Sequence, residues 1–202
     1  MATAPADTET MPVRRPRGRP RDPRVEGAVL GATRDLLLEK GYGGLTIAAA
    51  ADMAGVGKGT VYLRWPDKES LVVGALAEVW DPVADIDTGN LRDDLFGFMT
   101  SAMRRMNGRD GRLFREVLAE LSRSEPLKTY WVNEISRPWV GVLTACLKRG
   151  IERGEMRTDA DLHATTQVLL SPLLAVPMMD DKKMTARNVN AWLDVVLGGI
   201  AP

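Results

Sequence analysis

Apolar residues recur at spacings of three and four along most of the chain, and this periodicity constrains the fold more than any other feature. The first run starts after Pro23, which suits a first helical position, and stops at the glycine-rich stretch from Gly41. From Leu91 onward every periodic stretch has the same spacing, and none alternates over the length of a strand. Such spacing places apolar side chains on one face of a helix, so we expect an all-α fold of about nine helices.

The chain divides into a basic first module and a larger second one. Formal net charge is zero, but residues 11–70 hold eleven Lys and Arg against seven Asp and Glu. A basic module attached to a neutral or acidic one is typical of proteins that bind nucleic acid. The polar stretch from Asp81-Pro82 to Asn90 predicts a linker. We therefore expect a disordered basic arm over 1–22, a small helical domain over 23–80 and a larger one over 81–202.

Residues 46–65 predict two short helices joined by a glycine-containing turn, the pattern of a helix-turn-helix. Thr46 is a candidate N-cap, Gly55 allows a backbone conformation that a β-carbon would penalise, and Pro66 ends the second helix. Small Ala51 lets the helices cross closely. Such a unit can also be a purely structural hairpin. The polar groups left on the second helix to meet phosphates and base edges are Lys58, Thr60, Tyr62 and Arg64.

This stretch resembles the TetR family of transcriptional regulators. The resemblance is specific over about residues 22–80, and beyond them it covers only architecture and length. It implies an N-terminal three-helix DNA-binding domain and a C-terminal helical domain for ligand binding and dimerisation. The residues that match are Thr46, Ile47, Ala54-Gly55-Val56, Tyr62-Leu63-Arg64-Trp65 and Lys68-Glu69-Ser70-Leu71, preceded by Gly41-Tyr42-Gly43-Gly44-Leu45.

The resemblance also implies which side chains touch DNA. Phosphate contacts are expected from Thr46, Tyr62 and Lys68. Gly57 departs from the family pattern, which has Ser or Thr there, so it cannot offer a hydroxyl to phosphate although glycine can still cap the helix. Ala50 replaces a larger aliphatic residue, which predicts a locally thinner core. The contacts expected in the major groove come from Lys58, Gly59, Thr60, Leu63 and Arg64.

An arginine-rich segment precedes the first helix. Residues 14–21 contain Arg-Gly-Arg-Pro, an element similar to an AT-hook. An extended segment of this kind can lie in a narrow, A·T-rich minor groove, where negative potential is strongest. Gly18 separates Arg17 from Arg19, and we expect these two arginines to enter that groove. The alternative is a solvated basic tail that adds only non-specific affinity.

The resemblance assigns dimerisation to the last two helices, from about Asp161 to Leu197. These helices are expected to pair with their symmetry mates in a four-helix bundle. The alternative is that their apolar residues pack only within one subunit. The candidate interface residues are Leu169, Leu173, Val189, Trp192, Leu193, Val196 and Leu197.

A small apolar or amphipathic inducer is expected to bind within the C-terminal helices. Methionine adapts to irregular apolar ligands, and ligand pockets are mostly apolar with a few polar groups. The alternative is that the same residues form plain core. The candidate ligand-binding residues are Phe98, Met99, Met103, Trp131, Trp139 and Met178.

The sequence gives no sign of catalysis, cofactor or metal. Cys146 and His163 are the only cysteine and histidine, no nucleophile motif surrounds either, and no metal-ligand cluster is present. Residues 57–60 lack the spacing of a phosphate-binding loop. A single cysteine fits a reducing cytoplasm. The longest apolar stretch, 168–179, is shorter than the roughly 20 residues that span a bilayer, so we expect no membrane association.

Together these features predict a homodimeric, cytoplasmic, sequence-specific DNA-binding regulator that is not an enzyme. The expected mechanism is repression, relieved when a small-molecule inducer releases the protein from a palindromic double-stranded operator. Two alternatives stay open: an architectural protein that binds A·T-rich DNA without an inducer, and a helical enzyme or scaffold.

Overall fold

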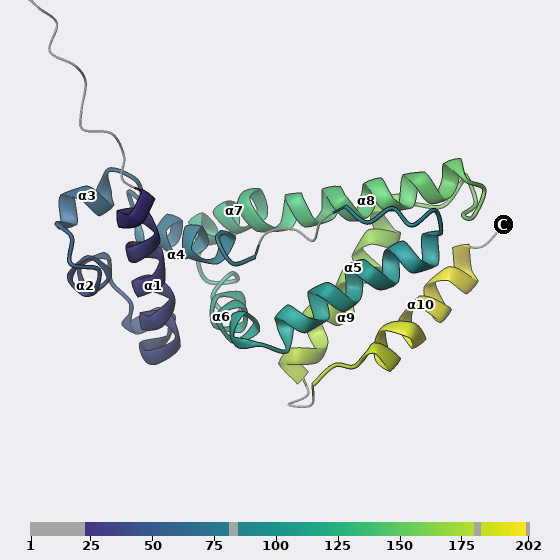
Figure 1. Cartoon of the computed structure of the whole chain (residues 1–202). Helices are drawn as coiled ribbons and strands as arrows, with labels where there is room; N and C mark the ends of the chain where they lie inside the picture. The colour runs from purple at the N-terminus through teal and green to yellow at the C-terminus, as the bar shows by residue number, and fades with distance from the viewer. Residues whose placement is uncertain (1–22, 81–84, 180–182, 201–202) are drawn as a thin grey trace, which may run out of the picture.

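Helices account for almost all of the described chain, as the apolar spacing predicts (Figure 1). The computed structural model describes residues 23–80, 85–179 and 183–200, and these ranges contain helices and no strand. The first four helices are α1 (Pro23–Gly44), α2 (Ile47–Met53), α3 (Lys58–Tyr62) and α4 (Lys68–Ala77). The others are α5 (Leu91–Met106), α6 (Arg109–Leu118), α7 (Glu125–Trp131), the π-helix η1 (Val132–Ser136), α8 (Arg137–Glu152), α9 (Leu162–Met179) and α10 (Ala186–Ile200).

The molecule is elongated, with α1, α2 and α3 gathered at one end (Figure 1). At the other end α5, α8, α9 and α10 pack together, and α8 contacts α5 and α9. Between the two groups lie α4, α6 and α7. Helix α4 contacts both α1 and α7, and α6 contacts α1 and α5. The predicted arm over residues 1–22 lies outside the described residues.

Local capping fixes the boundaries of the short helices. The Thr46 hydroxyl accepts a hydrogen bond from the Ala49 N–H (3.1 Å), so the predicted N-cap is confirmed. Asp67 accepts from the Ser70 N–H (2.7 Å) and begins α4 in the same way. Gly41 has a φ of 67°, which interrupts α1 near its end. Helix α3 ends at Tyr62, three residues before the predicted end, because the turn toward Pro66 begins there.

A π-helical turn joins α7 to α8. The sequence predicts a kink at Pro138, since proline lacks an N–H and clashes with the carbonyl four residues earlier. In the structure the Arg137 N–H donates to the Val132 carbonyl. This bond joins residues five apart, which is the wider hydrogen-bond spacing of a π-helix. The chain thus changes its hydrogen-bond spacing just before the proline and continues as one rod, α7-η1-α8.

Helix α9 is continuous, although its prolines predict an interruption at Pro172 and an end near Pro177. Both prolines lie inside the helix. The Ser171 hydroxyl donates to the Gln167 carbonyl (2.6 Å) and satisfies an acceptor within the helix. Helix α9 packs against α5, α8 and α10. Tertiary packing therefore maintains a helix that local propensity alone would interrupt.

Within the described ranges, α9 is also the single helix whose length and composition would allow it to cross a membrane. The apolar stretch 168–179 is only the last two thirds of it, whereas the whole helix has 18 residues with a mean hydropathy of 1.3. Only 22% of them are buried within the subunit. An apolar helix that its own chain covers so little needs another cover.

A buried carboxylate holds the segment before α5. Asp94 is 1% exposed and accepts hydrogen bonds from the Thr88 N–H and hydroxyl (both 2.6 Å) and from Arg153 of α8 (3.0 Å). Burial by itself raises the pKa of Asp94, but the hydrogen bonds from Thr88 and Arg153 outweigh it, and the net effect lowers the pKa. Asp94 therefore stays ionised and ties residues 85–90 to both helices.

Candidate nucleic-acid interface and ligand cavity

The helix-turn-helix is held by a small buried core. Gly55, at the turn between α2 and α3, has a φ of 67°, the left-handed conformation that the sequence requires of it. Ala50 and Ala51 of α2 and Val61 of α3 are each 0% exposed. Ala50 lies where the resemblance predicts a locally thinner core, and it is fully enclosed. This packing fixes the direction in which α3 presents its outer face.

The outer face of α3 carries the side chains predicted to meet the major groove. Lys58, Gly59 and Thr60 are exposed. Tyr62 is 53% exposed and Leu63, just after the helix, is 88% exposed. A leucine so exposed makes almost no contact with its own subunit. An apolar side chain in that place can contact the methyl group of a thymine.

Arg64 is held against the N-terminal helix. Its guanidinium forms an ion pair with Glu26 of α1 and lies 5.7 Å from the centre of the Trp65 ring. The side chain thus points along α1 while it remains partly exposed. Of the predicted groove contacts, Arg64 is the one already engaged by a carboxylate within the subunit.

Lys68 lies at the first turn of α4, beside the helix-turn-helix. Its ammonium is 4.0 Å from the centre of the Tyr42 ring, and burial lowers the pKa of Lys68. The Tyr42 hydroxyl in turn donates to Glu69 (3.0 Å), and burial together with Glu69 raises the pKa of Tyr42. Tyr130 of α7 donates to Asp67 (3.3 Å). This cluster joins the end of α1, the start of α4 and α7.

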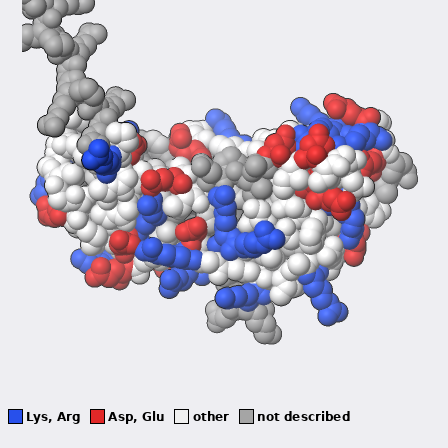
Figure 2. Space-filling view, in the orientation of Figure 1, with Lys and Arg blue, Asp and Glu red and all other residues white. Residues whose placement is uncertain are grey.

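On the face of the molecule that Figure 2 shows, surface charge does not by itself mark a DNA-binding region. On the side shown in Figure 2, Lys and Arg side chains are interspersed with Asp and Glu along the whole molecule. Arg17 and Arg19, the predicted minor-groove contacts, lie outside the described residues. Among the described residues, the candidate interface consists of individual side chains on and beside α2, α3 and α4.

A second feature is a cavity of about 130 Å³ in the C-terminal domain. It is lined by Trp80, which follows α4, and by residues of α5, α6, the α7-η1-α8 rod and α9. Its lining is apolar apart from the Ser136 hydroxyl and the indole N–H groups of its tryptophans. The lining residues are Trp80, Ala102, Met106, Phe114, Trp131, Ile135, Ser136, Trp139, Val140, Leu170, Leu173 and Leu174.

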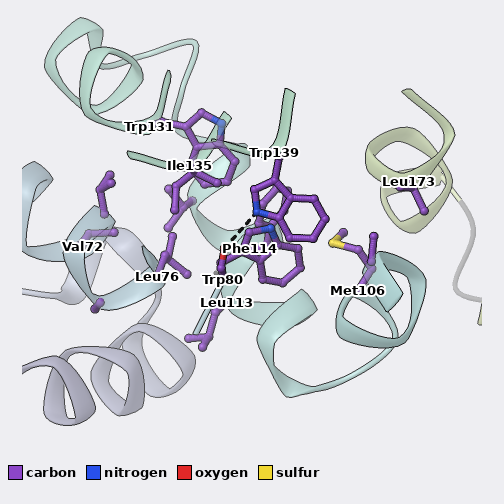
Figure 3. Packing of buried hydrophobic residues seen from close by; sticks show 14 of the residues in the cluster. Val72, Leu76, Trp80, Met106, Leu113, Phe114, Trp131, Ile135, Trp139 and Leu173 are labelled. Carbon is purple, nitrogen blue, oxygen red and sulfur yellow. Dashed lines mark hydrogen bonds between the residues drawn. The ribbon is translucent and has the colours of Figure 1, made fainter. Parts of the chain in front are cut away.

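Aromatic rings form the inner wall of the cavity (Figure 3). The Phe114 ring lies 4.5 Å from the rings of both Trp80 and Trp131, between centroids, and Trp139 lies 5.9 Å from Trp80. The Trp139 indole N–H donates to the Trp80 carbonyl (3.0 Å), the hydrogen bond dashed in Figure 3. Trp80 follows α4, so this bond ties the cavity wall to the helix that packs against α1.

Two of the six predicted ligand residues, Trp131 and Trp139, line the cavity. Phe98, Met99 and Met103 are buried in α5 but do not line it, because the cavity meets the part of α5 that carries Ala102 and Met106. Phe98 still contacts the Trp139 ring at 5.5 Å between centroids. Met178 is 54% exposed on α9, away from the cavity.

The other lining residues were missed by the sequence prediction, because nothing in spacing alone distinguishes a cavity wall from packed core. Trp80 is the clearest example. It falls at the predicted end of the fourth helix, beside the predicted linker, and its role follows only from the way α8 crosses that end.

The predicted dimer residues divide into two groups. Leu169, Leu173, Val189 and Leu193 are at most 3% exposed and pack inside one subunit, the alternative that the sequence left open, so they present no surface to a partner. Leu173 lines the cavity instead. Trp192, Val196 and Leu197 are partly buried on α10. The apolar side chains that α9 and α10 do expose are Val168, Leu174, Met178, Met179 and Val195, at 37% to 88%.

The fold and these surfaces define a helix-turn-helix protein with a larger helical second domain. Residues 29–75 match the family model for bacterial regulatory proteins of the tetR family, and residues 85–196 match that for the tetracyclin repressor-like C-terminal domain. The chain belongs to the TetR family of transcriptional regulators, as the resemblance of residues 22–80 predicts.

Relatives of known sequence or structure span nearly the whole chain. An uncharacterized HTH-type transcriptional regulator of Mycobacterium bovis is 33% identical, covering 89% of this chain and 91% of its own. The TetR family transcription regulator SCO0332 superposes with a TM-score of 0.70 at 27% identity, over 89% of this chain and 100% of its own. FadR of Bacillus subtilis, in complex with stearoyl-CoA, shares the fold with a TM-score of 0.66 at 20% identity. The match covers 87% of this chain and 99% of the FadR chain.

Proposed function

We propose that this protein is a dimeric repressor that a small molecule, bound in the C-terminal cavity, releases from a palindromic operator. The observation that carries the proposal is the Trp139–Trp80 hydrogen bond, because it connects the cavity wall to α4. Helix α4 packs against α1, and α1 packs against α2 of the helix-turn-helix. A change in the cavity therefore has a continuous packed route to the DNA-binding surface.

DNA contacts are proposed for the exposed residues around α3. The Lys58, Thr60 and Leu63 side chains would read base edges, with the Gly59 backbone close to the groove. Thr46, Tyr62 and Lys68 would bind phosphates and fix the register. Arg64 would join them only by leaving Glu26. From the sequence alone, Arg17 and Arg19 are proposed to enter the adjacent minor groove.

A second copy of the chain is the proposed cover for α9 and α10. Support comes from the low burial of α9 within its own subunit and from the exposure of Met179 (88%) and Val195 (78%). Closed twofold pairing would bury these side chains on both copies at once. The same symmetry would place two α3 helices in successive major grooves, about 34–36 Å apart.

Release by ligand is proposed to follow from differential affinity. A ligand shifts the protein only if it binds the DNA-free conformation more tightly than the DNA-bound one. Occupation of the cavity would displace Trp139 or Trp80, tilt α4 and change the separation of the two α3 helices. FadR, which shares this fold, is in complex with stearoyl-CoA, and this supports a small-molecule ligand for a regulator of this fold.

The proposal is tested by titrating the purified protein against the intergenic DNA upstream of its own gene. The titration is run at two salt concentrations with excess random duplex. Nanomolar binding to a palindrome that survives the competitor supports the repressor. Binding that the competitor abolishes favours an architectural role on A·T-rich DNA, and no binding at either salt contradicts the proposal.

A further inference from the structure

We infer that the cavity takes a neutral, mainly apolar molecule about the size of one aromatic ring, with at most one hydrogen-bonding group directed at Ser136. This inference rests on the proposed function, because it names the chemical class of the ligand for the same cavity. It is carried by the volume, the charge and the polar groups of the lining residues.

The volume sets the size of the occupant. The cavity measures about 130 Å³. An apolar protein cavity of roughly 150 Å³ stays dry when empty and binds benzene. A long acyl chain or a nucleotide is several times larger than this space. The bound molecule must therefore be small, unless the walls move apart by far more than a side-chain adjustment.

The lining residues themselves carry no charge. None of the twelve is ionisable near neutral pH. The arginines close to the lining donate to backbone carbonyls, Arg105 to that of Val79 (3.3 Å) and Arg115 to that of Met106 (3.4 Å), and the Arg105 guanidinium packs 6.0 Å from the centre of the Trp139 ring. A carboxylate in the cavity would lose its water and find no cation among the lining residues, which is costly. A neutral molecule avoids this penalty.

The lining offers flat aromatic surface and few polar groups. Phe114 and Trp131 meet edge to face at 63°, so ring faces and edges are both presented. The Trp139 N–H is already used by Trp80. The Ser136 hydroxyl is partly buried and makes no hydrogen bond to any residue in the described ranges. Its hydroxyl can therefore bond to a polar group of a ligand, and so can the indole N–H groups of Trp80 and Trp131, for which no hydrogen bond is found among the described residues.

The location of Ser136 supports this role. It is the last residue of η1, and π-helical turns occur often at functional sites. Ser136, Val140, Leu170 and Leu174 are the less buried lining residues, and they form the rim between α8 and α9. A ligand that enters between these helices would have its ring among the tryptophans and its polar end at the rim.

The test is isothermal titration calorimetry of the full-length protein, without DNA, against toluene, benzyl alcohol and benzoate. These probes share a ring and differ in polarity and charge. We expect both neutral probes to bind at least tenfold more tightly than benzoate. Equal or tighter binding of benzoate, or of a long-chain acyl-CoA, would overturn the inference, as would the failure of every neutral probe to bind.

Variants locate the binding. Ser136→Ala should weaken the binding of benzyl alcohol about three- to tenfold, which is the effect of removing one hydrogen bond. The binding of toluene should stay unchanged. Ala102→Leu should fill the cavity and abolish the binding of both benzyl alcohol and toluene. The control Ala119→Leu changes an exposed alanine and should leave the binding of both probes unchanged. Val140→Phe blocks the rim and replaces Ala102→Leu if that variant does not fold. Unchanged toluene binding in a folded cavity-filling variant contradicts the assignment.

Because these titrations contain no DNA, their result is independent of the operator experiment. A protein that binds a palindrome but none of the neutral rings keeps the proposed function and loses the inference. A protein that binds toluene in the cavity but no DNA keeps the inference and contradicts the proposed function.

Discussion

Leu63 tests the helix-turn-helix at the scale of one residue, because its side chain is 88% exposed and has no structural task within the subunit. If it contacts a thymine methyl, Leu63→Ala should weaken operator binding by about 1 kcal/mol, roughly fivefold, without a change in stability. The measurement is a fluorescence titration against operators in which single thymines are replaced by uracil.

The uracil series supplies the control for Leu63. At the contacted position, uracil should weaken binding of the unsubstituted protein and have no further effect on Leu63→Ala. Additive losses at every thymine would contradict a direct contact.

Lys68 should act on all sequences alike, since a phosphate contact carries no base information. Lys68→Ala should weaken operator and random duplex by similar factors. The slope of log affinity against log salt should fall by about 0.9 for each phosphate that the variant no longer neutralises. The matched control is Lys148→Ala, an exposed lysine on α8. A weakening confined to the operator would remove Lys68 from the phosphate-binding residues.

Asp94 should make stability depend on pH. Its pKa is lowered below the ordinary 3.8, so its contribution is fully present above that value and is lost as the pH falls through the folded-state pKa. Asp94→Asn should cost about 2 kcal/mol in unfolding free energy at pH 7, because it removes the charged hydrogen bonds with Thr88 and Arg153. Urea unfolding measures it.

The difference between the native protein and Asp94→Asn should shrink in acid, below about pH 4. Asp93→Asn is the matched control, since Asp93 is exposed in the same turn of α5. A gap that stays constant down to pH 3 would mean that Asp94 acts through packing alone.

At the residue scale, the features that the sequence predicts are helix caps and turns, because these depend only on neighbouring residues. The Thr46 cap, the left-handed Gly55 and the start of α4 at Asp67 all follow from residue types at fixed offsets. The Glu26–Arg64 ion pair does not, because it joins two helices whose crossing is set by the packing of the whole domain.

At the scale of the helix, the proposed coupling between the cavity and α4 runs through the α7-η1-α8 rod. Trp139→Phe keeps an aromatic ring in the wall and removes the N–H that donates to the Trp80 carbonyl. We expect the ratio of operator affinities without and with saturating ligand to fall at least threefold, since an unpaired buried carbonyl costs about 1–3 kcal/mol. The two affinities are measured by fluorescence anisotropy.

Trp131→Phe is the control for that measurement. Trp131 also lines the cavity and packs on Phe114, but no hydrogen bond from its indole to α4 is found in the described structure. The ratio of operator affinities without and with saturating ligand should not change in Trp131→Phe. An equal fall in both variants would mean that ring size, and not the hydrogen bond, carries the coupling.

Helix boundaries show where local rules reach their limit. Apolar spacing predicts every long helix from α5 onward, because one buried face is enough to specify a helix. It fails at Pro172 and Pro177, which α9 accommodates through packing, and at η1, where the backbone changes spacing before Pro138. The cavity escapes prediction for the same reason: it exists only where several helices meet.

For the whole molecule, the question is what covers α9 and α10. Val195 is 78% exposed on α10, so Val195→Glu should leave the subunit folded and should disrupt pairing between copies. Light scattering should then give the mass of one chain, and operator affinity should fall by more than a hundredfold, since one subunit holds only half of a palindrome. Lys148→Glu is the charge control.

A dimer that persists in Val195→Glu would place the interface elsewhere. Binding of the unsubstituted protein to neutral phosphatidylcholine vesicles would instead identify lipid as the cover of α9, in line with the length and hydropathy of that helix.

The hydrogen bond between Trp139 and the Trp80 carbonyl also has a consequence for ligand binding. Coupling between two binding sites is reciprocal: if a ligand weakens operator binding by some factor, the operator weakens ligand binding by the same factor. Each operator copy therefore holds protein in its low-affinity form for the ligand. Saturating the purified protein with operator DNA should therefore raise the ligand concentration needed for half-saturation of the cavity, by the factor by which the ligand weakens operator binding.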